Sequence, residues 1–216
     1  MSEPICAAAE PVPSWVVSTS ELPTPAELAE CSTTPGLPDE AFEHDGLITK
    51  RHVRASAFAF LRPAAGELMW DVGLGSGAMA IEWCRAAPGA TAIGLERKAE
   101  RAERAVRNIE RMVPGRVQVV IGEASKTLAG LPAPDAIFIG GGVTDGVLDG
   151  CWQALKPGGR IVAHGVTLDT EALLAERYRT YGGSLTRLAI ENAEPLGRFL
   201  SWTPARAVTQ WACTKQ

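Results

Sequence analysis

The stretch that decides the fold is Asp71–Gly77, which reads Asp-Val-Gly-Leu-Gly-Ser-Gly. The predicted strand Glu67–Val72 leads into it, and a helical pattern over Ala78–Arg85 follows. Glycines at such a junction let the backbone turn tightly and approach a ligand with no Cβ in the way. The exposed N–H groups at the start of the helix favour an anionic group. The stretch therefore predicts a ligand-binding turn between a strand and a helix.

Strands and helices alternate through most of the chain. This alternation implies right-handed βαβ units, so we predict an α/β fold with a mainly parallel sheet covered on both faces. After residue 183 the pattern changes to two alternating runs, which we expect to pair antiparallel at one sheet edge. The further strands are predicted at Thr91–Glu96, Val117–Ile121, Asp135–Ile139, Arg160–His164, Leu185–Glu191 and Ala207–Ala212. The further helices are predicted at Thr49–Leu61, Ala99–Met112, Asp145–Leu155 and Thr170–Tyr181.

The composition fits one folded domain with an extension. The chain has 216 residues, of which 46% are hydrophobic and 21% charged, close to the averages of globular proteins. Residues 1–35 are rich in Pro, Ser, Thr and Glu and lack apolar periodicity. We interpret them as a flexible acidic arm or linker before a domain over residues 36–216. No stretch approaches the roughly 18 apolar residues of a membrane span, and no basic secretory start is seen, so we predict a cytoplasmic protein that does not bind membranes.

The charges and cysteines argue against several classes of site. The first 49 residues hold nine acidic residues and no Lys or Arg, so the remainder carries a formal charge of +5 although the whole chain carries −4. That surplus suits an anionic small molecule or a nucleic acid about equally, but the clustered basic stripe expected for nucleic acid is missing. The five cysteines and three histidines are scattered, so we expect neither a disulfide framework nor a metal site.

Two motifs at the next strand ends point to a cofactor that contains a nucleoside. Glu96 ends the second predicted strand, where a carboxylate accepts hydrogen bonds from ribose hydroxyls. A solvated acid at a helix start is the alternative. Residues 122–124, Gly-Glu-Ala, end the third strand, where such sites meet adenine. Because the loop 73–78 also satisfies the dinucleotide pattern G-x-G-x-x-A, these motifs leave S-adenosylmethionine and NAD open.

Two later motifs separate these alternatives. Asp135–Ile139 is followed by Gly140–Gly142, an open turn at the carboxyl end of the fourth strand, where open parallel sheets bind ligands. Leu155–Val162 then gives a helix end, a Pro-Gly-Gly turn and a strand. In this order the pieces resemble class I S-adenosylmethionine methyltransferases, a Rossmann-like fold with a mainly parallel seven-stranded sheet and an antiparallel C-terminal pair. The cofactor that this resemblance implies is S-adenosyl-L-methionine.

Five short motifs narrow the resemblance over residues 36–216. They are similar, as an ordered set, to the decarboxylating precorrin methyltransferases of cobalamin biosynthesis, in particular to the C15-methylating, C-terminal domain of the precorrin-6Y C5,15-methyltransferase family. At residues 47–48 the chain has Leu-Ile where relatives often have Met before the Thr. The motifs are Gly36–Phe42, Leu47–Arg54, Ile139–Gly141, Val166–Leu168 and Pro195–Gly197.

The resemblance implies a reaction and partners. It implies methylation of precorrin-6B at C15 and decarboxylation of the C12 acetate side chain, for which no metal or protein nucleophile is required. It also implies an N-terminal methyltransferase domain in the same polypeptide, a homotetramer and no nucleic-acid partner. An RNA or other small-molecule methyltransferase of the same class is the alternative. The sequence pI of about 5.5 and the absence of an Asn-Pro-Pro-Tyr-type motif argue against an RNA base methyltransferase.

The resemblance also implies the residues of the site. Thr49 would reach the cofactor from the start of a helix, and a helix N-cap is its alternative role. The basic residues beside Thr49 are candidates for the carboxylates of a precorrin, with a solvated helix face as the alternative. Glu123 and His164 lie at strand ends near the expected site, but neither is assigned as a general base. The cofactor-binding set is Thr49, Gly73, Leu74, Gly75, Ser76, Gly77, Glu96, Arg97, Gly122, Glu123, Ala124 and Gly140, and the substrate-binding set is Lys50, Arg51, Arg54 and Gly141.

Overall fold

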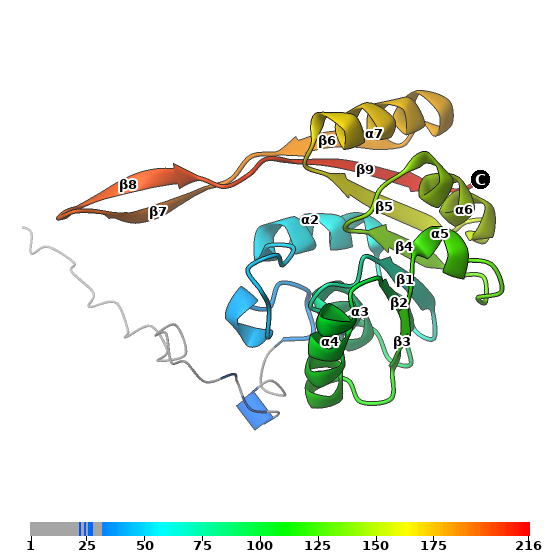
Figure 1. Ribbon diagram of the computed structural model, residues 1–216, viewed down its shortest axis with the longest axis horizontal. Coiled ribbons are helices and arrows are strands. Elements are labelled where there is room, and N and C mark those ends of the chain that lie inside the picture. The colour runs from blue at the N-terminus through cyan, green and yellow to red at the C-terminus, as the bar shows by residue number, and fades with distance from the viewer. Residues whose placement is uncertain (1–21, 23, 25, 28–31) are drawn as a thin grey trace, which may run out of the picture.

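The computed structural model describes residues 22, 24, 26–27 and 32–216, and most of the expected arm 1–35 lies outside these residues. Its centre is a seven-stranded sheet in the order β3-β2-β1-β4-β5-β9-β6 (Figure 1). Strands β1 to β5 are parallel to one another, and β9 runs antiparallel between β5 and β6. The strands are β1 Leu68–Val72, β2 Thr91–Glu96, β3 Val117–Ile121, β4 Ala136–Ile139, β5 Arg160–Gly165, β6 Ser184–Leu188 and β9 Val208–Thr214.

Helices cover both faces of the sheet, so its central strands are buried on both sides, as their apolar runs predict. One face packs against α2 (Arg51–Leu61), α3 (Ala78–Ala86) and α4 (Ala99–Met112). The other packs against α5 (Ala124–Thr127), α6 (Asp145–Ala154) and α7 (Leu168–Tyr181). Figure 1 shows these two helical layers around the strands. The predicted fold class is therefore confirmed, including the antiparallel strand near the C-terminus.

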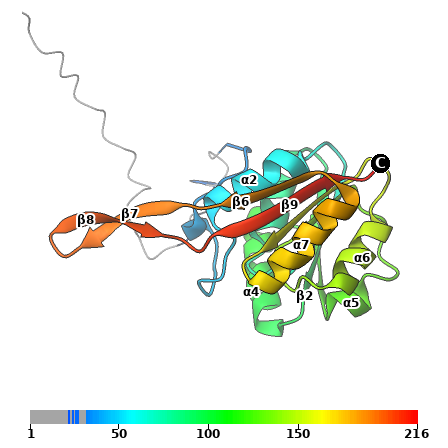
Figure 2. The same ribbon diagram turned by 90° about the horizontal axis from the view of Figure 1, so that it is seen from above.

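A hairpin outside the sheet was not predicted. Strands β7 (Glu191–Leu196) and β8 (Phe199–Pro204) pair only with each other and project away from the body (Figures 1 and 2). The first alternating run thus ends earlier than expected, at Leu188. The hairpin escaped prediction because Glu191, Asn192, Glu194 and Pro195 give β7 no apolar alternation.

A buried charge network attaches the segment before α2 to the body. The fully buried Arg54 guanidinium donates to Asp39 and Glu82 at 2.7 and 3.0 Å, and to the carbonyl oxygens of Thr49 and Leu37. Glu82 in turn accepts from the backbone N–H groups of Gly36 and Leu37. Helix α2 starts at Arg51 with Lys50 at its N-cap, so the alternative role of Thr49 as the helix cap is wrong.

In the part of the chain that the structure describes, no helix has the length and apolar character of a membrane span. Among the same residues, no three His, Cys, Asp or Glu side chains gather as metal ligands would. The described cysteines Cys84, Cys151 and Cys213 are buried free thiols.

Candidate functional site

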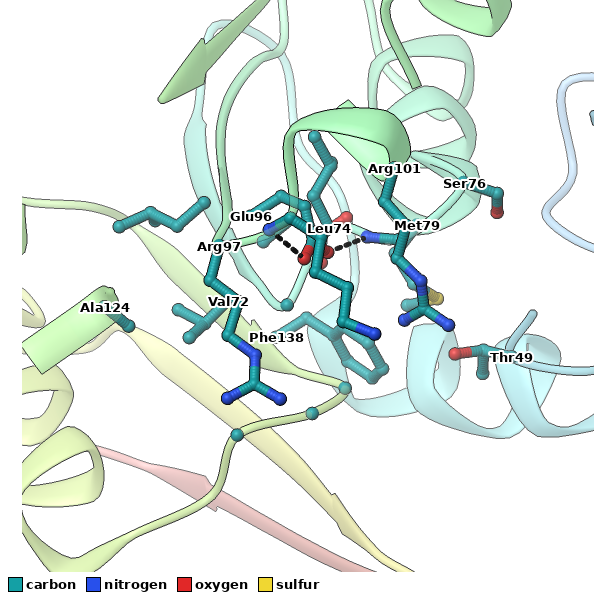
Figure 3. Close-up of a pocket in the computed structure, with 18 of the residues that line it drawn as sticks. Thr49, Val72, Leu74, Ser76, Met79, Glu96, Arg97, Arg101, Ala124 and Phe138 are labelled. Atoms are coloured by element: carbon teal, nitrogen blue, oxygen red, sulfur yellow. Dashed lines mark hydrogen bonds between the residues drawn. The ribbon is translucent and has the colours of Figure 1, made fainter. Parts of the chain in front are cut away.

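A cavity of about 610 Å³ lies at the carboxyl ends of β1, β2, β3 and β4, the edge where open parallel sheets bind ligands. This volume is within the range of small-molecule sites, ~300–1,000 Å³. Figure 3 shows the side chains that surround it. The cavity is lined by Leu47, Ile48, Thr49, Asp71, Val72, Gly73, Leu74, Gly75, Ser76, Ala78, Met79, Leu95, Glu96, Arg97, Lys98, Arg101, Gly122, Glu123, Ala124, Ser125, Phe138, Gly140, Gly141, Gly142, Thr144 and Val147.

The glycine loop forms the floor of the cavity, and its glycines have different roles. Gly73 and Gly75 have φ values of +83° and +57°, which L side chains rarely adopt. A Cβ on Gly73 would lie 2.9 Å from the backbone nitrogen of Gly141, so the two loops are in close contact. Gly77 is not part of the lining: a Cβ there would face Ala105 and Ile109. Its predicted cofactor contact is therefore not supported, because it serves the packing of α3 on α4.

Glu96 is held at the mouth of the glycine loop. Its two carboxylate oxygens accept hydrogen bonds from the backbone nitrogens of Gly75 and Lys98, each at 3.0 Å (dashed in Figure 3). A carboxylate has more acceptor positions than these two bonds use. The side chain is therefore fixed in place while it keeps acceptor capacity for hydroxyl groups of a ligand. This geometry fits the ribose-binding role predicted for Glu96.

Asp71, which was not predicted as a site residue, is the buried acid of the cavity. Burial raises the pKa of Asp71 to about 8, while a hydrogen bond from the Ala80 backbone lowers the pKa and the nearby Glu96 raises it. A neutral carboxyl group beside Glu96 avoids two like charges in one cavity. The signal in the sequence was its position as the first residue of the glycine stretch.

His164 does not line the cavity. Its Nε2 lies 2.9 Å from Oε1 of Gln210, and its ring stands edge-on to Phe138, which does line the cavity. Burial lowers the pKa of His164 to about 4, so the ring is neutral at neutral pH. His164 therefore supports the wall of the site from behind. Glu123 does line the cavity, and it forms an exposed ion pair with Lys126 at 2.6 Å.

The basic residues of the cavity come from the start of α4. Arg97, Lys98 and Arg101 all line it, and Figure 3 shows Arg101 reaching toward the side where Thr49 points its hydroxyl inward. Lys50 and Arg51 are exposed and outside the lining. Arg54 is buried in its own ion pairs, so the prediction that it contacts substrate is wrong.

A short segment before α2 covers the cavity, and α4 holds it there. Leu47, Ile48 and Thr49 line the cavity from this segment. Asp45 pairs with Arg101 and Arg104 at 2.9 and 3.3 Å. Arg101 and Arg104 of α4 therefore hold this segment over the cavity.

Asn108 adds a neutral anchor to this cover. Its Oδ1 accepts from the Glu43 nitrogen at 2.9 Å, and its Nδ2 donates to the carbonyl oxygens of Glu43 and Ser76 at 3.0 and 2.9 Å. The side chain thus joins the segment above the cavity to the glycine loop below it. No sequence motif marked this role.

The strand order, the glycine loop after β1 and the acid at the end of β2 are those of class I S-adenosylmethionine methyltransferases, and the chain has that fold. Within this class, the family model described as the precorrin methyltransferase domain matches residues 40–215 of the sequence. The chain therefore belongs to the precorrin methyltransferase family.

Two relatives and one solved structure show how far the similarity extends. Precorrin-6Y C(5,15)-methyltransferase [decarboxylating] of Sinorhizobium sp is 53% identical over 182 residues, which cover 83% of this chain and 44% of that protein. The C-terminal domain structure of precorrin-6Y C5,15-methyltransferase from Rhodobacter capsulatus is 45% identical, with a TM-score of 0.81, over 86% of this chain and all of that domain. A probable cobalt-precorrin-6B C(15)-methyltransferase (decarboxylating) of Pyrobaculum calidifontis is 31% identical over 83% of this chain and 97% of that protein.

The chain thus spans less than half the length of the first of these relatives and nearly all of the third.

Proposed function

We propose that this chain transfers a methyl group from S-adenosylmethionine to C15 of precorrin-6B and removes the carboxyl group of the C12 acetate side chain, in cobalamin biosynthesis. The observation that carries the proposal is the fixed Glu96 carboxylate above a glycine loop, in a chain of the precorrin methyltransferase family. The Pyrobaculum relative bears the name of the C15 reaction and aligns over 97% of its own length. That extent supports the C15 half of the chemistry, rather than the C5 half, for this chain.

The cavity would hold the cofactor through groups of known position. Glu96 would accept the ribose hydroxyls, residues 122–124 would lie along the adenine, and Thr49 would meet the methionine carboxylate. The loop residues Gly73–Ser76, with Arg97 and Gly140, complete this contact set. When bound, S-adenosylmethionine supplies an electrophilic methyl group. The protein's own part is to align the acceptor carbon with that group and to exclude water.

The second step needs no residue that acts as a nucleophile. When the acetate side chain loses carbon dioxide, the electron pair of the broken C–C bond passes to the methylene carbon and into the conjugated ring. A proton from solvent then completes the methyl group. The exposed bases at the start of α4, Arg97 and Lys98, would meet other carboxylates of the substrate, and Gly141 would lie beside the ring. Lys50 and Arg51 are exposed outside the cavity and would meet only the periphery of the substrate.

The proposal extends to assembly and location. In the register of the β7–β8 hairpin, Ala193, Pro195, Leu200 and Trp202 share one face, and Leu200 and Trp202 are 75% and 69% exposed. An exposed apolar face of this kind is typical of an interface, which supports the homotetramer implied by the family resemblance. The Sinorhizobium relative, of which this chain covers 44%, supports an N-terminal methyltransferase domain as a partner in the same polypeptide. We place the reaction in the cytoplasm.

The proposal is tested by mass spectrometry of precorrin-6B incubated with the protein and S-adenosylmethionine. A product that has gained one methyl and lost one carbon dioxide is the expected result. Unchanged precorrin-6B, with the cofactor still bound in calorimetry, would remove the precorrin assignment and leave RNA or another small acceptor to be tested.

Glu96→Ala tests the cofactor site separately. We expect weaker S-adenosylmethionine binding by about 1–3 kcal/mol, the usual range for hydrogen bonds to a charged group. Glu100→Ala, which removes an exposed acid from the first turn of α4, is the matched control and should leave the affinity unchanged. Equal affinities of the two variants in calorimetry would contradict the role of Glu96.

A further inference from the structure

The turn Gly140–Gly142 contains three consecutive glycines, and the protein itself accounts for two of them. A Cβ on Gly140 would lie 2.7 Å from Cε1 of Phe138. Gly142 has a φ of +70°, which L side chains rarely adopt. Gly141 has neither constraint, because its φ is not positive and a Cβ there would meet no atom within 4 Å. Neither backbone conformation nor packing within the described residues therefore requires glycine at position 141.

Gly141 is nevertheless held at a defined place in the cavity. Its backbone nitrogen, oxygen and Cα lie 2.9–3.2 Å from where a Cβ on Gly73 would be. Gly141 also lines the cavity, next to Phe138 and the glycine loop. The open space above Gly141 is thus bounded by the Gly141 backbone, which packs against Gly73 on its other side. A ligand in that space would meet bare peptide.

Two apolar side chains stand exposed at the end of the neighbouring strand. In the β4–β5 register Ile139, the last residue of β4, faces Ala163, and β5 continues for two more residues to Gly165, so the turn with Gly141 follows β4 beside the end of β5. Immediately after Gly165, Val166 and Leu168 are 47% and 83% exposed. Neither side chain is among those that line the cavity, and neither covers the core; large apolar side chains exposed in this way mark a binding surface.

We propose that the methyl acceptor lies over Gly141, with Val166 and Leu168 as its apolar rim, and that Gly141 sets how closely the acceptor ring approaches the cofactor cavity. This role rests on the proposed function and adds the element that selects the shape of the acceptor. A bare peptide admits the flat edge of a conjugated macrocycle at contact distance, whereas a side chain would hold the ring away. The apolar rim suits the hydrocarbon part of such a ring, and its carboxylates remain for the bases of α4.

Gly141→Ala tests this role, with Gly146→Ala as the matched control. A Cβ at either position meets no atom within 4 Å, and neither glycine has a positive φ, so both variants should fold with an unfolding temperature no lower than that of the wild type. For Gly141→Ala we expect kcat/KM with precorrin-6B to fall by roughly tenfold or more, because small displacements of a reacting group have effects of that size. The affinity for S-adenosylmethionine should stay unchanged in both variants, and kcat/KM of Gly146→Ala should stay close to that of the wild type.

Leu168→Ser tests the rim by a second route. It should raise the KM for precorrin-6B and leave both kcat and cofactor affinity as they are, because it removes apolar contact with the acceptor alone.

The possible results are distinct. A wild-type protein that does not turn over precorrin-6B would overturn the proposed function and this role with it. An active wild type with Gly141→Ala equal to Gly146→Ala would overturn this role and keep the function. Weaker cofactor binding by Gly141→Ala would also overturn it, because Gly141 would then contact the cofactor and not the acceptor.

Discussion

Two clusters of basic residues, one at the start of α2 and one at the start of α4, look alike in the sequence and have different surroundings in the structure. The α2 cluster consists of Lys50, Arg51 and Arg54, and the α4 cluster consists of Arg97, Lys98 and Arg101. In the first cluster one guanidinium is fully buried among acids, and the other two cations are exposed outside the cavity. In the second cluster all three cations line the cavity.

The difference shows what a local concentration of charge can and cannot indicate. Arg54 follows Lys50 by one helical turn, yet it faces inward, where its guanidinium meets Glu82 of α3 and Asp39 of the preceding segment. Nothing in residues 50–54 specifies that partner, since Glu82 lies 28 residues further along the chain. A basic cluster therefore predicts a surface with useful charges, and long-range packing decides which member reaches a ligand.

The largest effect is expected from Arg54→Ala. This variant leaves the buried Glu82 and the half-buried Asp39 without their cation and removes the donor to the Leu37 carbonyl. Loss of one partner of a buried ion pair costs about 3–5 kcal/mol in the free energy of unfolding. Urea denaturation followed by circular dichroism measures this change. The double variant Arg54→Ala, Glu82→Gln is the control, and its destabilisation should be smaller than the sum of the two single effects.

The buried acids differ in the same way as the basic clusters. Arg54 compensates the charge of Glu82, whereas no ion pair of the described residues includes Asp71. With a pKa of about 8 in the folded state and 3.8 as its ordinary value, Asp71 keeps a proton on folding that the unfolded chain releases. Stability should therefore fall as pH rises from about 5 to 8.

Asp71→Asn removes this dependence. Relative to the variant, the wild type should lose up to about 4 kcal/mol of unfolding free energy across that range. Urea denaturation at pH 5 and pH 8 gives the two differences, and parallel changes in both proteins would contradict a protonated Asp71.

A smaller effect is expected from Lys98→Ala. The side chain is exposed at the cavity, and its loss removes one charge that would meet a substrate carboxylate. An exposed ion pair is worth up to about 1 kcal/mol, so the KM for precorrin-6B should rise by roughly threefold to fivefold. Added salt should reduce the difference between variant and wild type, because exposed charges are screened. A KM that does not change would move the carboxylate contact away from α4.

The smallest effect is expected from Arg51→Ala. The Arg51 backbone nitrogen donates to Asp39, and alanine keeps that bond, while the exposed guanidinium lies outside the cavity. Both the unfolding free energy and the activation free energy should stay within about 0.5 kcal/mol of the wild type. Activity assays run beside those of Lys98→Ala make this test. A rise in KM for Arg51→Ala as large as that for Lys98→Ala would remove the contrast between the two clusters.

Most of the sheet could be predicted because its signals are local. Each of the parallel strands is a short apolar run, and a charged residue or a glycine-containing turn marks its end. The strands β1 to β5 therefore begin and end within one or two residues of their predicted bounds. The hairpin β7–β8 could not be predicted in this way, since all its residues are exposed and no core imposes an alternation on them. The helix α5 was missed because four residues are too few to show a helical period.

The site was predictable where the backbone forms it and much less so where side chains do. The positions of Gly73, Gly75 and Glu96 follow from strand ends and turns, and all three line the cavity. For Gly77 the sequence could not distinguish a contact with a ligand from packing on a neighbouring helix, because a positive φ serves either kind of turn. Arg54 was expected at a substrate and is buried, whereas Lys98 was not predicted and lines the cavity, because contacts between residues far apart in sequence decide both positions.

The amide of Asn108 has a consequence for which substitutions the chain can accept. One flat group satisfies one donor and two acceptors of the neighbouring backbone, above and below the cavity. Aspartate would keep the acceptor and lose both donors, and glutamine would carry the amide one methylene too far. Asparagine is therefore the residue whose side chain can make all three bonds at this position, and the attachment of the segment above the cavity to the loop below it tolerates no conservative substitution.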